Sequence, residues 1–244
     1  MVEAAPSPRG SISAVITFHR ERALATPTLA SVERMRRHAE ARGWSMELVM
    51  TLDGDDAETE RAILTHPALR EGDTLHRIRV GDLSLSRNHA IAHARGDYVA
   101  ILDGDDLFSA NWISAAVELI EREGPRHIAH PKLIIAFGAW HAWWEQIDQT
   151  DPRFLPETLF KLNHWNACSV ARREVFLDCP YELARVGDGF GFEDWHWNCQ
   201  TIARGYVHRV VPETFRLERR KHEGSLNLAH QRHAAVLRPS AFFD

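Results

Sequence analysis

Apolar runs alternate with amphipathic stretches along the first half of the chain. The runs at 12–18, 46–52 and 97–103, and a partly polar run at 74–80, predict four strands. Between them, helical spacing of apolar residues predicts helices at 26–43, 57–66 and about 84–95, the first with Thr26 as N-cap and Gly43 as its stop. Strands that alternate with helices, and that are apolar on both faces, indicate a parallel sheet covered on both sides.

The second half of the chain is less regular. A helix is expected from Asn111 to Glu123, followed by a strand at 127–137 in which Pro131 favours a sheet edge or a bulge. The tryptophan-rich stretch 139–154 matches no regular core element. The remaining pattern predicts a helix at 195–205 and a final pair of strands, YVHRVV and TFRLERR.

Composition narrows the class of protein. The chain has 244 residues, 44 % of them hydrophobic, which suits one large domain. A net charge of -5 and a pI of about 6.3, with only the short basic run RLERRKH, argue against nucleic-acid binding. The three cysteines form no CxxC pair, and no apolar leader or stretch of 18 apolar residues occurs. We therefore expect a soluble cytoplasmic protein, and the tryptophans leave peripheral membrane contact open.

The pentapeptide LDGDD occurs twice, at 52–56 and 102–106, each time after an apolar strand. Ligands of parallel sheets bind beyond the carboxyl ends of the strands. In the second copy Asp103, Asp105 and Asp106 repel one another, and Mg²⁺ or Mn²⁺ would compensate them, with Gly104 allowing a sharp turn. A solvent-exposed acidic turn explains the same residues. In the first copy Asp53 either contacts a nucleotide or belongs to a turn.

Four segments, in order, resemble the signatures of family 2 glycosyltransferases, which have the GT-A fold: ISAVITFHRE, LDGDD, LSLSRNHAIAHARGDYVAILDGDD and GFGFEDWHW. The resemblance covers about residues 10–225. It implies an α/β fold with a mixed, mostly parallel central sheet flanked by helices and a C-terminal acceptor-binding portion. Within one domain it divides the chain into a flexible lead (1–10), a nucleotide-sugar-binding half (11–110), a catalytic and acceptor-binding half (111–225) and a tail (226–244).

The same resemblance implies a nucleotide-sugar donor, with UDP- and GDP-sugars the first choices, and Mn²⁺ or Mg²⁺ on its diphosphate. It places Asp103 and Asp105 on the metal and Asp53 on the base. The full donor-binding set that it implies is Thr17, His19, Glu21, Asp53, Arg87, Asp103 and Gly104. Phe18, His19 and Arg20 replace the usual Pro-Tyr-Asn, and Leu52 replaces an aspartate. These departures leave the nucleotide open.

The Glu-Asp pair of GFGFEDWHW is expected to carry out the proton transfer. We assign Asp194 as the general base of an inverting transfer and Glu193 as its orienting partner, although Asp194 could instead cap a helix. Trp195 could stack on an acceptor sugar or belong to the core. His222 could complete the metal shell or be one surface histidine among 15. The implied acceptor is a hydroxyl of a glycan, a lipid-linked molecule or a small molecule, in glycan or polysaccharide synthesis.

Two other functions remain in view. A nucleotidyltransferase would carry glycines and basic residues directly after the first strand, and FHRERALATP lacks those glycines. A non-catalytic nucleotide- or glycan-binding module would not need Asp103, Asp105 and Asp194 together. The sequence therefore favours an enzyme of sugar transfer.

Overall fold

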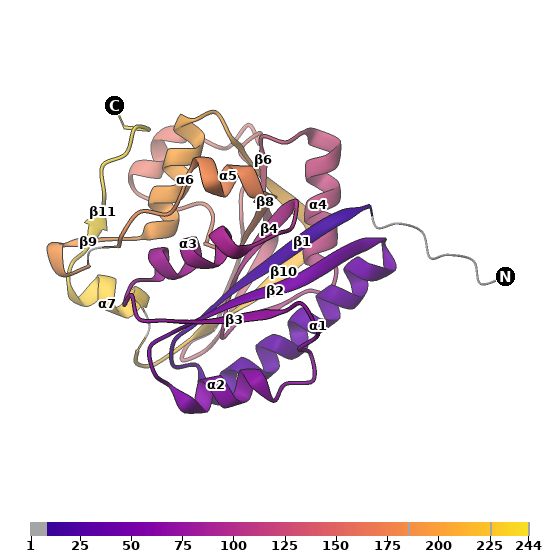
Figure 1. Cartoon of the computed structure of the whole chain (residues 1–244). Coiled ribbons are helices and arrows are strands. Elements are labelled where there is room, and N and C mark those ends of the chain that lie inside the picture. Colours follow the sequence, from indigo (N-terminus) through magenta and orange to yellow (C-terminus); the bar gives the residue numbers. More distant parts are fainter. Residues whose placement is uncertain (1–8, 185, 225, 244) are drawn as a thin grey trace.

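The computed structural model describes residues 9–184, 186–224 and 226–243, and its centre is one large sheet (Figure 1). Within these ranges the sheet has nine strands in the order β3-β2-β1-β4-β8-β6-β10-β5, with β7 paired to β6. Their bounds are β1 Gly10–Phe18, β2 Trp44–Asp53, β3 Thr74–Ile78, β4 Tyr98–Asp103, β5 Leu107–Phe108, β6 His127–Gly138, β7 Ala142–Glu145, β8 Ser169–Arg172 and β10 Val207–Arg220. Two further short strands, β9 Phe190–Gly191 and β11 Val236–Leu237, pair with each other.

Helices cover both faces of this sheet, and each face has its own apolar core (Figure 1). One core joins Ile12, Ala14 and Ile16 of β1 to the first, second and fourth helices, and the other joins Val15 to the third, fifth and sixth. The bounds are α1 Ala25–Ala41, α2 Ala57–Leu64, α3 Leu83–His93, α4 Trp112–Glu123, α5 Arg173–Asp178, α6 Glu193–Ala203 and α7 Leu226–Arg232. The unalternated apolar strands are thus buried on both sides, as predicted.

The pairing of the strands brings the predicted site residues to one edge. β1 pairs in parallel with β2 and β4, and β2 with β3, so the carboxyl ends of these strands lie together. Thr17 and Asp103 are direct neighbours across the β1–β4 ladder. β8 is antiparallel to β4 and to β6, while β10 runs parallel to β6. Strands from both predicted halves of the chain therefore belong to the same mixed sheet.

Several expected details are wrong. α1 begins at Ala25 rather than after a Thr26 cap, because a 3₁₀ turn at Arg22–Leu24 leads directly into it. The expected final pair of strands is the single strand β10, whose register shifts between Val211 and Phe215. Pro131 is not in an edge strand, since β6 lies between β8 and β10, but the expected bulge is present, because the register shifts directly after the pair Pro131–Val211. Part of the tryptophan-rich stretch is the strand β7.

Other expectations concern the termini and the cysteines. The predicted lead lies mostly outside the described residues, and the described part of the tail contains α7 and β11. Cys168, Cys179 and Cys199 are buried free thiols. Across the described ranges, no helix combines the length and apolar character needed to cross a bilayer.

Candidate active site

A cleft of about 810 Å³ opens at the carboxyl ends of β1, β2 and β4. The rest of its wall comes from α3, α6, the segment around α7, the end of β10, and the segments 140–146 and 161–167. Its lining contains every residue predicted for the site except His222: Thr17, His19, Glu21, Asp53, Arg87, Asp103, Gly104, Asp105, Glu193, Asp194 and Trp195. The fold therefore brings together side chains that lie up to 178 positions apart in the sequence.

Two buried arginines hold Asp103 at the end of β4. Arg87 Nη2 of α3 lies 3.0 Å from Asp103 Oδ1, and Arg216 Nη2 of β10 lies 2.7 Å from Oδ2. Burial opposes the ionisation of Asp103, but the charges of Arg216 and Arg87 keep the pKa of this carboxyl below its usual range. Asp103 is therefore a charged group at neutral pH, fixed from two sides.

Arg216 is a site residue that the sequence reasoning missed. Its Nε also donates to Asp106 Oδ2 over 2.6 Å, and Asp106 Oδ1 accepts the backbone N–H of Arg219 over 2.7 Å. Asp106 is only 1 % exposed and both of its oxygens are bonded to β10, so its carboxylate orients Arg216. The run RLERRKH gave no signal of this role, because the pairing depends on a strand register across 110 positions.

The carboxylate of Asp105 faces a lysine. Lys221 Nζ lies 2.7 Å from Asp105 Oδ2 and 3.8 Å from Glu21 Oε1. Burial opposes the charge of Lys221, yet Asp105 and Glu21 raise its pKa above the ordinary value. Burial raises the pKa of Glu21. A cationic group thus already lies between these two acids.

The carboxylates at this end of the cleft suit a hard divalent cation. Asp103 and Asp105 offer carboxylate oxygens, the ligands that Mg²⁺ and Mn²⁺ prefer. Among the described residues that line the cleft, acidic side chains outnumber basic ones, so an added cation would improve the charge balance. His222 is exposed and does not line the cleft. Its role as a metal ligand stays a prediction.

Glu193 and Asp194 begin α6 and differ in their surroundings. Glu193 Oε1 accepts a hydrogen bond of 2.9 Å from Arg87 Nη1. Asp194 Oδ1 accepts the N–H of Trp195 over 2.8 Å, and Oδ2 accepts Asn163 Nδ2 over 3.3 Å. Burial, and then the charge of Glu193, raise the pKa of Asp194 to about 7. The carboxyl of Asp194 can therefore exchange a proton near neutral pH.

The backbone before this pair is unusual. Phe192 has a φ of 60°, in the left-handed region that a bulky side chain rarely adopts. It occupies the N-cap position, so Asp194 lies in the first turn and is not the cap. The side chain of Phe192 packs against Trp195 and His230, which fixes the strained residue from both sides.

The predicted nucleoside end of the cleft is built around Asp53. Asp53 Oδ1 accepts the backbone N–H of Val80 over 2.9 Å, and Ser86 Oγ lies 3.3 Å from Oδ2. The backbone N–H of His19 donates to Glu21 Oε2 over 2.5 Å, and the ring of His19 contacts the carbonyl of Asp53. These bonds tie together the loops after β1, β2 and β3.

The opposite wall carries aromatic rings and one unpaired amide. The guanidinium carbon of Arg220 lies 4.7 Å from the ring centre of Trp140 and 5.9 Å from that of Trp144. Trp195 Nε1 donates to Leu159 O over 3.0 Å. Both polar side-chain atoms of Asn166 are buried at the cleft without a hydrogen-bond partner among the described residues. A buried amide without a partner is a candidate for hydrogen bonds to a ligand. No sequence pattern had indicated Asn166.

Comparisons with known proteins agree with this architecture. The sequence profile described as glycosyl transferase family 2 matches residues 13–179. The structure of S. aureus TarS 1–349 in complex with UDP-GlcNAc is similar, with a TM-score of 0.68 and 14 % identity over 88 % of this chain and 60 % of that one. A mannosyltransferase, PcManGT from Pyrobaculum calidifontis in complex with GDP-Man and Mn²⁺, has a TM-score of 0.59 and 18 % identity over 91 % and 61 %.

The chain thus spans about 60 % of the length of these solved structures, and no curated protein sequence matches it. The likeness confirms the expected mixed α/β fold of GT-A type. The match over residues 13–179 covers more than half of the sequence and most of the predicted donor site. The chain belongs to glycosyl transferase family 2.

Proposed function

We propose that the protein is a metal-dependent inverting glycosyltransferase that moves a sugar from a nucleotide-sugar to an acceptor hydroxyl. The observation that carries this proposal is the pair of bonds made by Arg87. One guanidinium contacts Asp103, at the expected diphosphate end, and Glu193, beside the expected base. Diphosphate binding and proton removal are the two tasks that sugar transfer combines, and the residues that we propose for them line one cleft.

A UDP- or GDP-sugar is the donor that we propose. TarS was solved with UDP-GlcNAc and with UDP, and PcManGT with GDP-Man. The nucleoside would be surrounded by Thr17, His19, Glu21 and Asp53. The carboxylate of Asp53 would contact it while keeping its bonds to Val80 and Ser86. Gly104 would let the diphosphate approach the backbone after β4.

Asp103 and Asp105 would hold Mn²⁺ or Mg²⁺. When bound, such an ion offsets the charge that develops on a departing diphosphate. Arg216 keeps Asp103 ionised and fixed in direction. Lys221, paired with Asp105, is a second positive group at the same end of the cleft and would share the charge of the phosphates.

Asp194 would act as the general base. The acceptor oxygen forms a bond to the anomeric carbon, the bond from that carbon to the diphosphate oxygen breaks, and the acceptor proton passes to Asp194. Attack from the face opposite the leaving group inverts the anomeric centre. A base with a pKa of about 7 suits this task, since it holds the proton weakly enough to release it afterwards. Glu193 stays paired with Arg87 and orients the first turn of α6.

The acceptor would lie against the aromatic wall. Indole rings stack on the apolar faces of sugars, and Trp195, Trp140 and Trp144 line this part of the cleft. Asn166 would supply hydrogen bonds to a hydroxyl group. A glycan, a lipid-linked molecule or a small molecule would all present such a group. Trp143, with 73 % of its surface exposed, is where a membrane surface could be contacted, and a cytoplasmic location stays a prediction.

A donor panel tests the proposal. Purified protein is incubated with UDP- and GDP-sugars, with and without Mn²⁺. Two quantities are measured: the release of the nucleoside diphosphate and the Tm of the protein. We expect one nucleotide class to raise the Tm only with metal and to be hydrolysed or transferred. The Asp194→Asn variant should keep the Tm shift and lose turnover. Binding with equal turnover in both proteins would contradict the role of Asp194, and binding without turnover in either would favour a non-catalytic module.

A further inference from the structure

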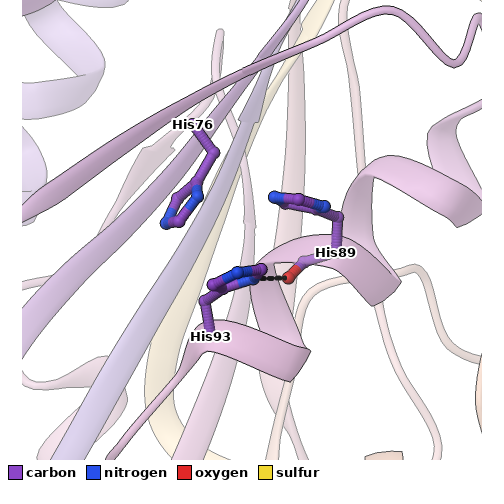
Figure 2. Close-up of side chains that lie close together, drawn as sticks. All are labelled: His76, His89 and His93. Atoms are coloured by element: carbon purple, nitrogen blue, oxygen red, sulfur yellow. Dashed lines mark hydrogen bonds between the residues drawn. The ribbon is translucent and has the colours of Figure 1, made fainter.

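Three histidines meet between β3 and α3 (Figure 2). His76 belongs to β3, and His89 and His93 lie one turn apart on α3. One ring nitrogen from each comes within 4.8 Å of the others. None of the three lines the cleft, so the proposed sugar transfer leaves the cluster unexplained.

Hydrogen bonds leave one ring nitrogen each of His89 and His93 free to coordinate, while His76 Nε2 lies 3.2 Å from Thr74 Oγ1. His93 Nδ1 lies 2.8 Å from the carbonyl of His89, which can only accept, so Nδ1 carries the hydrogen and Nε2 keeps its lone pair. A metal-binding histidine typically donates its other N–H to a backbone carbonyl in this way. His89 Nε2 is buried and has no hydrogen-bond partner among the described residues. A bound ion would satisfy it.

The packing of the three imidazole rings also suits a shared ion. The rings already contact one another, with centroids 4.3 Å apart for His76 and His93 and 4.4 Å for His89 and His93.

We propose that His76, His89 and His93 bind one Zn²⁺ ion that joins the edge strand β3 to α3. Three imidazoles suit Zn²⁺, whereas Mg²⁺ requires oxygen ligands that this cluster does not provide. Zn–N bonds of about 2.0–2.1 Å require nitrogens roughly 3.4 Å apart. Rotation of the side chains can shorten the present separations between the ring nitrogens, which are within 4.8 Å, to this distance. Because His93 is exposed, a water molecule can complete a tetrahedral shell.

The position of the site suggests a structural role. β3 has a strand partner on one side only, β2, and α3 packs against β1 and β2. An ion at the cluster adds a direct link between β3 and the C-terminal half of α3. The same helix carries Arg87, so the link would stabilise the element that presents this arginine to the cleft. This inference does not depend on the proposed sugar transfer.

The test is zinc binding to the full chain, freed of metal by chelation and lacking any added histidine tag. Calorimetric titration with Zn²⁺ should give one tight site, a rise in Tm of about 5 °C, and a tetrahedral visible spectrum with Co²⁺. The His89→Gln/His93→Gln variant should bind at least tenfold more weakly. The His233→Gln and Asp103→Asn variants should bind as the wild type does, because His233 is an exposed histidine outside the cluster and Asp103 belongs to the cleft.

Equal zinc affinity in the double variant would overturn the proposal, as would no stoichiometric binding by the wild type at micromolar concentration. Loss of binding in Asp103→Asn alone would place the ion in the cleft instead. If the double variant does not fold, as judged by far-UV circular dichroism, the single variant His76→Gln on the edge strand replaces it with the same expectation.

Discussion

Arg216 Nη2 lies 2.7 Å from Asp103 Oδ2, so the carboxylate proposed to hold the metal shares its charge with a buried guanidinium. The same arginine pairs with Asp106. The acidic cluster after β4 is therefore neutralised in part by β10, a strand more than 100 positions later in the chain.

Replacing Arg216 should destabilise the protein strongly. The Arg216→Ala change leaves Asp106 without its guanidinium partner and Asp103 with Arg87 alone, and breaking a buried pair typically costs about 3–5 kcal/mol. Urea unfolding measures this loss. The control is Arg37→Ala, because Arg37 forms an exposed pair with Glu33 and such pairs contribute about 0–1 kcal/mol. Equal losses in the two variants would show that Arg216 does not compensate these acids.

The activity of the enzyme should rise with pH through the pKa of Asp194. A base must be ionised, and burial beside Glu193 raises this pKa to about 7. The kcat/KM for transfer should therefore increase tenfold per pH unit below about 7 and level off above it. The Asp194→Asn variant should lose about 100-fold or more in kcat and show no such limb. A wild-type profile that is flat between pH 5 and 8 would contradict the assignment.

The same substitution should stabilise the fold in a pH-dependent way. Because the folded-state pKa of Asp194 lies above its unfolded value, the wild type loses stability as pH rises from about 4 to about 7. The Asp194→Asn variant avoids that loss. Its free energy of unfolding should exceed that of the wild type by about 1–3 kcal/mol at pH 8 and by less at pH 5. A stability gain that is the same at both pH values would point to packing instead.

Asn166 should matter for ligands and not for folding. Neither polar atom of its side chain has a hydrogen-bond partner in the described part of the chain, so Asn166→Ala should change stability by less than about 1 kcal/mol and raise the KM for the acceptor about tenfold. Asn198→Ala is the matched control. Asn198 Nδ2 donates to Asn163 Oδ1 and Trp165 O, each at 2.9 Å, and its loss should cost about 1–3 kcal/mol. If Asn166→Ala destabilises the protein as much as Asn198→Ala does, the amide is a structural group.

Gly104 should tolerate no side chain. A Cβ there would lie 2.4 Å from Phe18 Cδ1 and 2.7 Å from the carbonyl of Thr17. We expect Gly104→Ala to cost more than about 2 kcal/mol and to weaken donor binding, because Thr17 and Phe18 must move. Gly187→Ala should be neutral, since a Cβ at Gly187 meets nothing within 4 Å. Thermal unfolding with and without nucleotide measures both effects, and a neutral Gly104→Ala would refute the steric argument.

The sequence predicted β1 to β4 and β6, and a set of residues that the structure brings into one cleft, because both depend on local patterns. Apolar runs that end in Asp-Gly motifs indicate buried strands and their carboxyl ends, and a parallel sheet places those ends together. Arg216 was missed because its role depends on long-range pairing, and Asn166 because its side chain has no hydrogen-bond partner among the described residues. The cluster of His76, His89 and His93 was missed for the same reason as Arg216, since it joins a strand to a helix.

Helix boundaries failed where backbone conformation decided them. A 3₁₀ turn at Arg22–Leu24 leads directly into α1, and Phe192, in the left-handed conformation, lies directly before α6. The sequence gives no sign of either conformation, since Arg22 and Phe192 both have a positive φ and neither residue type favours it. The Glu193–Asp194 pair could still be found, because its residue types and order are characteristic by themselves.

The double attachment of Arg87 means that the two ends of the proposed reaction share one buried side chain. A ligand that displaced the carboxylate of Asp103 would also change the hydrogen bond between Arg87 and Glu193, the residue next to the proposed base. Occupation of the proposed donor site and the position of the first turn of α6 would then be coupled through this guanidinium.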